Sequence, residues 1–248
     1  PRLMAKDRRR SLRTGGGFTR AGGGFSTASA PAAWSPVTLG AHLWLRGESY
    51  AVGGAGEGTW TDLSGNGRDF TITAPNTPAG SAAALNGRPG VSFDGANDYL
   101  SRAAFLSGTT NAEWWFVARS TRANGVTNGW HDLGSNATSC LYPYQDDHVY
   151  DGVGSTTRRD AGVGTAFVRN AHIHHAIAAT GAYTINVNGS AFFTGGNTCG
   201  WAATFKLGES TTPGTVFMGL LFEVVCTPIL SAGDRTLLLA YLQSGWGL

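Results

Sequence analysis

The sequence predicts an all-β fold, a two-sheet antiparallel sandwich, and three observations support this prediction. Glycine is abundant, with 37 of 248 residues, and aromatic residues make up 11% of the chain. Short apolar stretches alternate with turns rich in Gly, Asn and Asp, as strands and hairpins require. Apolar residues at helical spacing occur only near the C-terminus. Since sandwiches often use about 200 residues or more as one unit, we expect one large domain and an appendage.

The appendage is residues 1–33, which we expect to form a basic, glycine-rich arm before a domain at residues 34–248. Residues 1–34 hold seven Lys or Arg and one Asp, and the motif GGGF occurs twice in them. Such a segment cannot bury a core, so we expect a partner to hold it; the alternative is a flexible solvated tail. The residues expected to anchor the arm are Arg8, Arg9, Arg10, Arg13, Phe18, Arg20 and Phe25.

Charge and hydropathy argue against some classes of partner for the rest of the chain. Beyond residue 34 there are eleven basic and fifteen acidic residues, so the pI near 8.7 reflects the arm. Nucleic acid is therefore not an expected partner of the domain. No apolar run is long enough to span a membrane, and no secretory signal is recognised. Because the chain starts at Pro1, we expect a native start after removal of Met and folding in a cytoplasm.

Three cysteines occur, Cys140, Cys199 and Cys226, at wide spacing and without a zinc-binding pattern. Buried reduced thiols are the favoured interpretation. A disulfide between Cys140 and Cys199 is the alternative.

The first half of the domain contains four expected strands. A tight turn is expected at residues 64–67 and a Pro/Ala/Gly-rich loop at residues 74–84. The run Trp114 to Ala118 is apolar throughout and predicts a central strand. The expected strands are at residues 43–45, 69–73, 90–93 and 114–118.

The second half contains further strands and one helix. Asn188-Gly189 predicts a type I′ hairpin turn between two strands. Ser231 is a good N-cap for a helix running to about Ser244. Its apolar face is expected to hold Leu237, Leu238, Tyr241 and Leu242. The expected strands are at residues 130–133, 141–144, 172–178, 183–187, 191–193, 205–208 and 217–225.

Several stretches occur in an order that carries a family resemblance. They are HLWLRGES, WTDLSGNGRDFT, LNGRPGVSFDGANDYLS, YTINVNG, FKLGES and FMGLLFEVVCTPILSAGDRTLLLAYLQSGWGL. Over residues 40–248 this resembles the LamG-like jelly-roll domains of the concanavalin A-like lectin/glucanase superfamily, of the kind found in phage virion proteins. The resemblance implies a two-sheet antiparallel jelly roll with a short C-terminal helix.

Glycoside hydrolysis on this fold needs paired carboxyl groups. The resemblance implies a catalytic pattern Glu-x-Asp-x-x-Glu, which the sequence lacks. Asp146-Asp147-His148 and Asp151 come closest, and Glu223 stands alone in an apolar run. From this we expect that the chain is not an enzyme.

Two groups of side chains contain residue types that can bind metal ions. His172, His174 and His175 have no acidic or Cys residue nearby in sequence, so we favour a structural strand face. The loop containing Asp94, Asn97 and Asp98 is rich in oxygen donors. It predicts either a structural calcium site or Asx-type turns, and we favour the turns. No other cofactor is expected.

The predicted function is that of a bacteriophage virion structural protein, a capsid decoration, head-fibre or tail-associated protein. The arm would bind viral capsid or tail proteins, many copies or a homo-oligomer would assemble, and the jelly roll would be displayed. Trp130, Tyr142 and Tyr144 would stack on host glycans if exposed; the alternative is that they are core residues. A carbohydrate-binding adhesin is the alternative function, and a glycoside hydrolase is disfavoured.

Overall fold

The computed structural model describes residues 34–54, 57–72 and 75–248. Residues 34–248 form one compact unit. The expected arm, with its anchors Arg8, Arg9, Arg10, Arg13, Phe18, Arg20 and Phe25, lies outside the described residues. In the described part, no helix has the length and apolar character to cross a membrane.

The larger sheet has eight strands in the order β14-β13-β12-β8-β16-β6-β5, and β1 also pairs with β16. All pairs are antiparallel. The long strand β16 therefore has β8 along one edge and β6 and then β1 along the other. The strands are β1 (Leu43–Arg46), β5 (Ala79–Leu85), β6 (Arg88–Asp94), β8 (Asn111–Ser120), β12 (His172–Ala179), β13 (Ala182–Val187), β14 (Ser190–Gly195) and β16 (Met218–Thr227).

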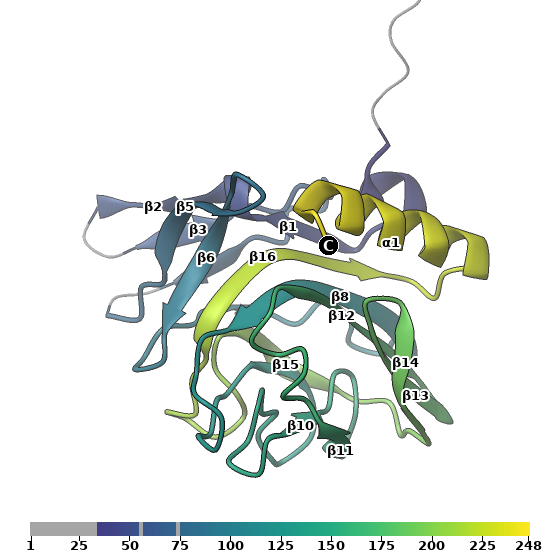
Figure 1. Ribbon diagram of the computed structural model, residues 1–248. Coiled ribbons are helices and arrows are strands. Elements are labelled where there is room, and N and C mark those ends of the chain that lie inside the picture. Colours follow the sequence, from purple (N-terminus) through teal and green to yellow (C-terminus); the bar gives the residue numbers. More distant parts are fainter. Residues whose placement is uncertain (1–33, 55–56, 73–74) are drawn as a thin grey trace, which may run out of the picture. The chain divides into compact units, whose positions relative to one another are not determined.

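The second sheet has six strands in the order β2-β3-β4-β7-β15-β9 and faces the first sheet. A small sheet pairs β10 with β11 and lies at the end of the molecule opposite α1 (Figure 1). The strands are β2 (Tyr50–Val52), β3 (Gly58–Trp60), β4 (Phe70–Ile72), β7 (Leu100–Ala103), β9 (His131–Gly134), β10 (His148–Asp151), β11 (Arg159–Val163) and β15 (Trp201–Leu207). The helical elements are η1 (Pro36–Leu39), η2 (Gly47–Ser49) and α1 (Ala232–Trp246).

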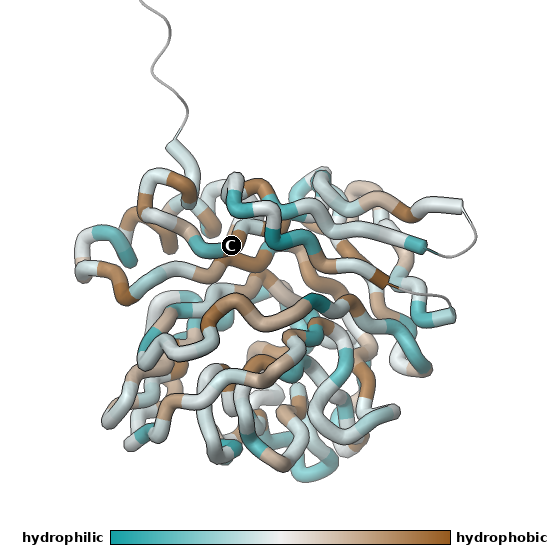
Figure 2. The backbone as a smooth tube through the Cα atoms, turned by 180° about the vertical axis from the view of Figure 1, so that it is seen from behind, coloured by the Kyte–Doolittle hydropathy of each residue, from teal (hydrophilic) through white to brown (hydrophobic). Residues whose placement is uncertain are grey.

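The two sheets enclose the main core, which contains Trp60, Trp114, Phe116 and Phe205. Seen from behind, the apolar stretches lie along the strands, whereas the connecting loops are more polar (Figure 2). The all-β two-sheet antiparallel sandwich is thus confirmed, because alternate faces of its strands supply one buried layer.

A second apolar layer lies between the outer face of the larger sheet and α1 (Figure 1). The helix begins as predicted, because the Ser231 hydroxyl accepts a hydrogen bond from the Asp234 amide at 3.1 Å. The predicted apolar face needs correction. Leu238 and Leu242 are buried together with Trp246, but Leu237 is 53% exposed. The buried stripe follows i, i+4 and i+8 spacing, and Leu237 lies beside it.

The expected loop at residues 74–84 is wrong over its second half, where β5 pairs with β6. The side chains of β5 are all exposed or half-buried, and most are Ala, Gly or Ser. Backbone pairing at a sheet edge holds this strand in place, so its sequence shows no apolar alternation.

Candidate functional site

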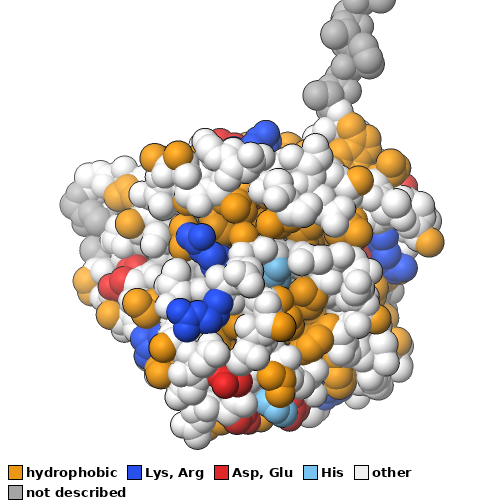
Figure 3. Space-filling view, in the orientation of Figure 1, with side chains coloured by type: hydrophobic (Ala, Val, Ile, Leu, Met, Phe, Trp, Pro, Cys, Tyr) orange, Lys and Arg blue, Asp and Glu red, His pale blue; other side chains and the backbone are white. Residues whose placement is uncertain are grey.

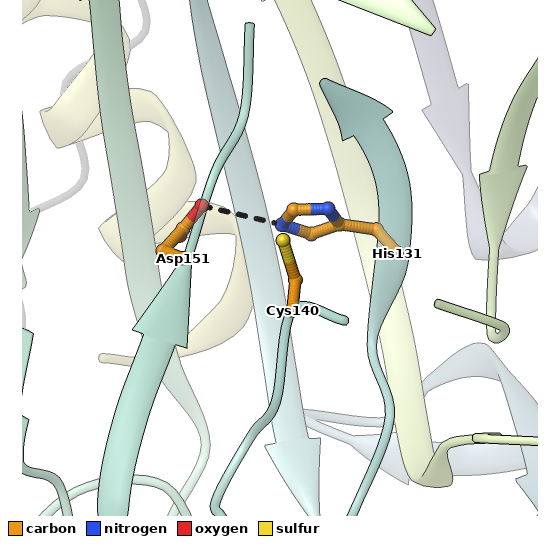
Figure 4. Close-up of side chains that lie close together, drawn as sticks. All are labelled: His131, Cys140 and Asp151. Atoms are coloured by element: carbon orange, nitrogen blue, oxygen red, sulfur yellow. Dashed lines mark ion pairs between the residues drawn. The ribbon is translucent and has the colours of Figure 1, made fainter. Parts of the chain in front are cut away.

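A group of buried polar side chains lies within the core beside the small sheet. His131 is on β9, Asp151 ends β10, and Cys140 lies on the loop between these strands; all three are fully buried. A ring nitrogen of His131, the Cys140 Sγ and a carboxylate oxygen of Asp151 lie within 4.8 Å of one another (Figure 4). The three side chains come from separate segments and point toward one another.

Neighbouring groups hold the Asp151 carboxylate firmly. His174 Nε2 donates to Oδ2 at 2.7 Å, and the Tyr183 hydroxyl and the Val153 amide donate to Oδ1 at 2.8 and 2.9 Å. Burial alone would raise the pKa of Asp151, but the His131 and His174 imidazoles outweigh burial and hold that pKa well below its usual value. Asp151 is therefore a buried carboxylate anion.

His131 contrasts with Asp151, because neither of its ring nitrogens makes a hydrogen bond. Its Nε2 lies 3.5 Å from Asp151 Oδ1, too far for a well-formed hydrogen bond. Burial raises the pKa of the adjacent Cys140 thiol well above its ordinary value, and the carboxylates of Asp151 and Asp132 raise it further. The cluster thus contains a fixed anion, an imidazole without a hydrogen-bond partner and a thiol.

Next to this cluster the surface is hollowed by a groove of about 570 Å³, between the β7–β8 loop and the start of β15. The half-buried ring of Trp201 lines it, and the Trp201 Nε1 donates to the Thr109 carbonyl at 2.9 Å, which fixes the ring. The other lining residues are small: Ala104, Ser107, Gly108, Thr109, Thr110, Cys199, Gly200, Ala202 and Ala203.

A glycine connects the groove with the buried cluster. Gly154 follows Asp151 by three residues and has a φ of +55°, and a Cβ there would lie 2.4 Å from the Trp201 ring. The Gly154 carbonyl also accepts the Gly200 amide at 3.2 Å. Only glycine fits this position. The segment that begins at Asp151 in the buried cluster therefore packs against the Trp201 ring at Gly154.

A second, smaller groove of about 280 Å³ lies where α1 meets the larger sheet. On the face that shows α1, apolar side chains line the seam beneath the helix (Figure 3). Two of its lining side chains, His175 and Arg235, already donate hydrogen bonds to Glu113, at 2.8 Å and 2.7 Å. This groove is therefore the junction between helix and sheet, and the first groove is the better candidate site.

The structure corrects two of the three predicted glycan-contacting residues. Trp130 and Tyr142 are fully buried, and their rings lie 3.9 Å apart within the main core. They are core residues and cannot stack on a surface glycan. Tyr144 is half-buried and packs edge-on against Tyr150, so its predicted contact with glycans stays a prediction.

The loop of Asp94, Asn97 and Asp98 is built from turns. Asp94 Oδ1 accepts the Ala96 amide at 2.7 Å, and Asp98 Oδ2 accepts the Asp94 amide at 2.8 Å. The first contact is an Asx-type turn, as the favoured interpretation expects for Asp94, and the second closes the loop from Asp98 back to Asp94. Burial raises the pKa of Asp98. The structural calcium site stays a prediction.

The three histidines of β12 have separate surroundings. His172 contacts the Tyr142 hydroxyl, His174 bonds to Asp151, and His175 stacks on Trp115 on the opposite face at 3.4 Å. Sequence reasoning found no acid or thiol near them, whereas the fold brings Asp151 to His174 across 23 residues. It missed His131, Cys140 and Trp201 as site residues, because no short-range spacing marks them.

The cysteines and the acidic candidates also have defined places. All three cysteines are free, so the Cys140–Cys199 disulfide does not form. The Asp146 carboxylate caps the His148 amide and accepts the Tyr150 hydroxyl at the surface. Glu223 is buried and accepts hydrogen bonds from the indole nitrogens of Trp44 and Trp246, each at 2.6 Å.

No family model and no curated protein sequence matches the chain. Several solved structures share its fold. A sialidase from Trypanosoma rangeli, in complex with 2,3-difluoro-KDN, matches over 80% of this chain and 32% of the sialidase, with a TM-score of 0.54 and 14% identity. Domain 4 of AbnA, a GH43 extracellular arabinanase from Geobacillus stearothermophilus in complex with arabinotriose, matches over 81% of this chain and 98% of that domain, with a TM-score of 0.50 and 15% identity.

The receptor binding domain of botulinum neurotoxin type G matches over 82% of this chain and 51% of that domain, with a TM-score of 0.56 and 10% identity. This chain thus spans about a third of the sialidase and half of the toxin domain. At such identities the likeness shows the fold, a β-sandwich compatible with the concanavalin A-like type.

These neighbours correct the expectation that the chain is not an enzyme. Sialidases and an arabinanase domain are among the structures that share the fold. The lack of one acidic motif therefore does not separate this chain from glycoside-processing proteins. The fold is a β-sandwich of a kind that also occurs in proteins named for glycosidase activity and receptor binding.

Proposed function

We propose that residues 34–248 form a carbohydrate-binding domain whose glycan site is the groove beside Trp201. The observation that carries the proposal is this groove: a fixed, half-buried indole borders a hollow of about 570 Å³. That volume lies in the range of small-ligand sites.

The lining suits a sugar better than an apolar ligand. Ser107, Thr109 and Thr110 are exposed and supply hydroxyl groups, and the indole supplies a flat apolar face. Small residues leave the groove open along its length. The arabinanase domain of the same fold was solved with arabinotriose, which supports an oligosaccharide as the ligand class.

The test measures binding of the full chain to a glycan array, and to arabinotriose and sialic acid by calorimetry. In the variant Ala203→Tyr, a bulky ring fills the groove from an exposed position, so we expect at least a tenfold loss of affinity. Ala191→Tyr adds the same ring to an exposed site on β14 and is the matched control. Unchanged affinity in the Ala203 variant would place the glycan elsewhere.

The same samples are assayed for released sugar. Binding without release indicates a binding domain, and release that Ala203→Tyr abolishes indicates processing of glycosides in this groove. Absence of any binding or release across the array contradicts the proposal.

The finer proposal is that the chain is a virion structural protein of a bacteriophage, a capsid decoration, head-fibre or tail-associated protein that displays this domain. Its support is in the sequence: the resemblance over residues 40–248 and the basic GGGF-containing residues 1–33. Arginines and phenylalanines of that segment would contact capsid or tail proteins, and many copies would assemble in the host cytoplasm. An adhesin that binds host glycans outside a virion is the alternative.

Complementation tests the virion proposal. We expect the full chain to be incorporated into particles, and a variant lacking residues 1–33 to fold, by circular dichroism, but to be absent from purified particles. Equal incorporation of both chains would show that residues 1–33 are not the attachment segment. Absence of the full chain from particles would contradict a virion role.

A further inference from the structure

The buried group His131, Cys140 and Asp151 has the composition and placement of a metal site. Among residues 34–54, 57–72 and 75–248, it is the one set of three His, Cys, Asp or Glu side chains whose donor atoms come this close together. Figure 4 shows the three side chains converging on one point from three segments. All three side chains are fully buried.

An independent observation points to a missing ligand. Neither Nδ1 nor Nε2 of His131 has a hydrogen-bond partner, although the ring is fully buried. Leaving buried polar atoms unpaired costs about 1–3 kcal/mol each, so native proteins rarely do so. The ring faces the Cys140 thiol and the Asp151 carboxylate, with Nε2 3.5 Å from Asp151 Oδ1, and a cation between them would give the imidazole nitrogen a bonded partner.

The surroundings of Asp151 resemble an outer ligand shell. His174, Tyr183 and the Val153 amide hydrogen-bond to the carboxylate and fix its orientation. Metal-ligating carboxylates and imidazoles are commonly held by such partners.

The chemical types of the three donor atoms indicate which metal ion the site would bind. One imidazole nitrogen, one sulfur and one carboxylate oxygen suit Zn²⁺, whereas Ca²⁺ and Mg²⁺ prefer oxygen donors alone. The aspartate and a cysteine thiolate would together balance the two charges of the ion. Binding would form the Zn–S bond and release the thiol proton to solvent.

We propose that His131, Cys140 and Asp151 bind a structural Zn²⁺ ion in the core of the sandwich. The ion would tie β9 to the end of β10 and to the loop between them. It would also fix the position of the segment from Asp151 to Gly154, and Gly154 packs against the Trp201 ring. This inference is independent of glycan binding, because its readouts are metal content and spectra.

The experiment refolds the full chain with Zn²⁺ or Co²⁺, because a fully buried site must be filled during folding. All chains carry Cys199→Ser, since the Cys199 thiol is partly exposed and would bind metal adventitiously. We expect one equivalent of Zn²⁺ to remain after dialysis against a weak chelator. The Co²⁺ protein should show a thiolate-to-metal charge-transfer band.

Matched variants assign the ligands. Cys140→Ser should remove the charge-transfer band and lower retained Zn²⁺ at least tenfold, and His131→Phe should lower retention similarly. Cys226→Ser, at an equally buried thiol in the core, should change neither. Circular dichroism of each variant confirms folding.

The proposal is overturned if the parent chain retains no more Zn²⁺ than the Cys140 variant, or if the charge-transfer band persists in that variant. In the first case a bridging water is the partner of His131. Both results compare the parent chain with Cys140→Ser, which replaces one sulfur atom by oxygen. The test therefore remains valid even if His131→Phe misfolds.

Discussion

Buried polar groups beneath α1 differ from one in the core between the two sheets. Beneath α1, Glu113 and Glu223 are nearly inaccessible, and both oxygens of each carboxylate accept hydrogen bonds. In the core, His131 of β9, a strand of the second sheet, is equally buried, and neither of its ring nitrogens has a hydrogen-bond partner. The paired carboxylates join the helix to the sheet, whereas a buried imidazole without a hydrogen bond is an exception that the proposed Zn²⁺ ion would explain.

The outer layer shows how a charge is used to attach a helix. Burial raises the pKa of Glu223, and the hydrogen bonds from Trp246 and Trp44 and the charge of Arg46 lower it only in part. Burial alone would likewise raise the pKa of Glu113, but His175 and Arg235 outweigh it and lower that pKa. Each carboxylate connects the sheet to α1 or to the segment that precedes it.

The largest expected effect comes from removing one of these carboxylates. Glu223→Ala leaves the indole nitrogens of Trp44 and Trp246 without their acceptor. We expect a loss of about 3–5 kcal/mol in the free energy of unfolding, measured by urea denaturation. Glu48→Gln, at a half-exposed ion pair with Arg88, is the control and should cost less than about 1 kcal/mol. Similar losses of unfolding free energy in Glu223→Ala and Glu48→Gln would contradict the view that the buried carboxylate stabilises the fold more than the exposed ion pair.

Two adjacent leucines of α1 test which face of the helix packs on the sheet. Leu238 is fully buried, and Leu237 is 53% exposed. Leu238→Ala should destabilise the protein by about 3 kcal/mol because it opens a cavity against the sheet. Leu237→Ala should change stability by less than about 0.5 kcal/mol. Thermal and urea unfolding of both variants measure the difference, and a costly Leu237→Ala would contradict the assigned face.

The inner face should make the protein acid-sensitive through His172. Burial lowers the pKa of His172 to about 3, below the ordinary value of 6.5 that applies in the unfolded chain. The unfolded chain therefore takes up the proton first as pH falls, and stability decreases from pH 6.5 toward pH 3. The decrease from this residue is at most about 1.4 kcal/mol per pH unit.

Urea denaturation between pH 7 and pH 4 measures this dependence. His172→Phe should give a shallower decrease than the wild type, whatever its absolute stability. His148→Gln, at an exposed histidine paired with Asp160, is the control. Because the pKa of His148 is raised, its stabilisation is fully present below pH 6.5, so this variant should leave the slope between pH 6 and pH 4 nearly unchanged. An unaltered slope in His172→Phe would show that this imidazole is not held neutral.

The smallest expected effect belongs to His131 in protein stripped of metal. The ring stacks on Phe116, and its Nε2 lies 3.5 Å from the Asp151 carboxylate, whose pKa it helps to lower. His131→Phe removes this neighbour, but Asp151 keeps the hydrogen bonds from His174, Tyr183 and the Val153 amide, so the metal-free chain should lose less unfolding free energy than in Glu223→Ala. A loss as large as that of Glu223→Ala would show that His131 is as well integrated as the outer carboxylates.

Much of the sandwich was predictable because its strands follow local rules. The apolar run at Trp114 to Ala118 lies in β8 between β12 and β16, as a central strand should. Asn188 and Gly189 both have positive φ, as their predicted turn requires. The edge strand β5 was not predictable, since backbone pairing and not side-chain burial holds it.

The candidate sites were mostly hidden from sequence reasoning. Trp130 and Tyr142 lie in a stretch rich in glycine, asparagine and serine, so the local sequence did not decide between core and surface; their rings fill the core. His131, Cys140 and Asp151 come together only because β9, β10 and the intervening loop fold back on one another. Convergence of that kind depends on tertiary structure and leaves no spacing pattern in the chain.

The position of β16 between β8 on one side and β6 and β1 on the other has a consequence for biosynthesis. Among the strands of the sandwich, the one that joins the early and middle parts of the larger sheet is translated last, and α1 with Trp246 follows it. A nascent chain stalled before β16 holds two unjoined sets of strands with open hydrogen-bonding edges. We therefore expect the sandwich to close after translation of this segment, and truncated products to be substrates for chaperones and proteases.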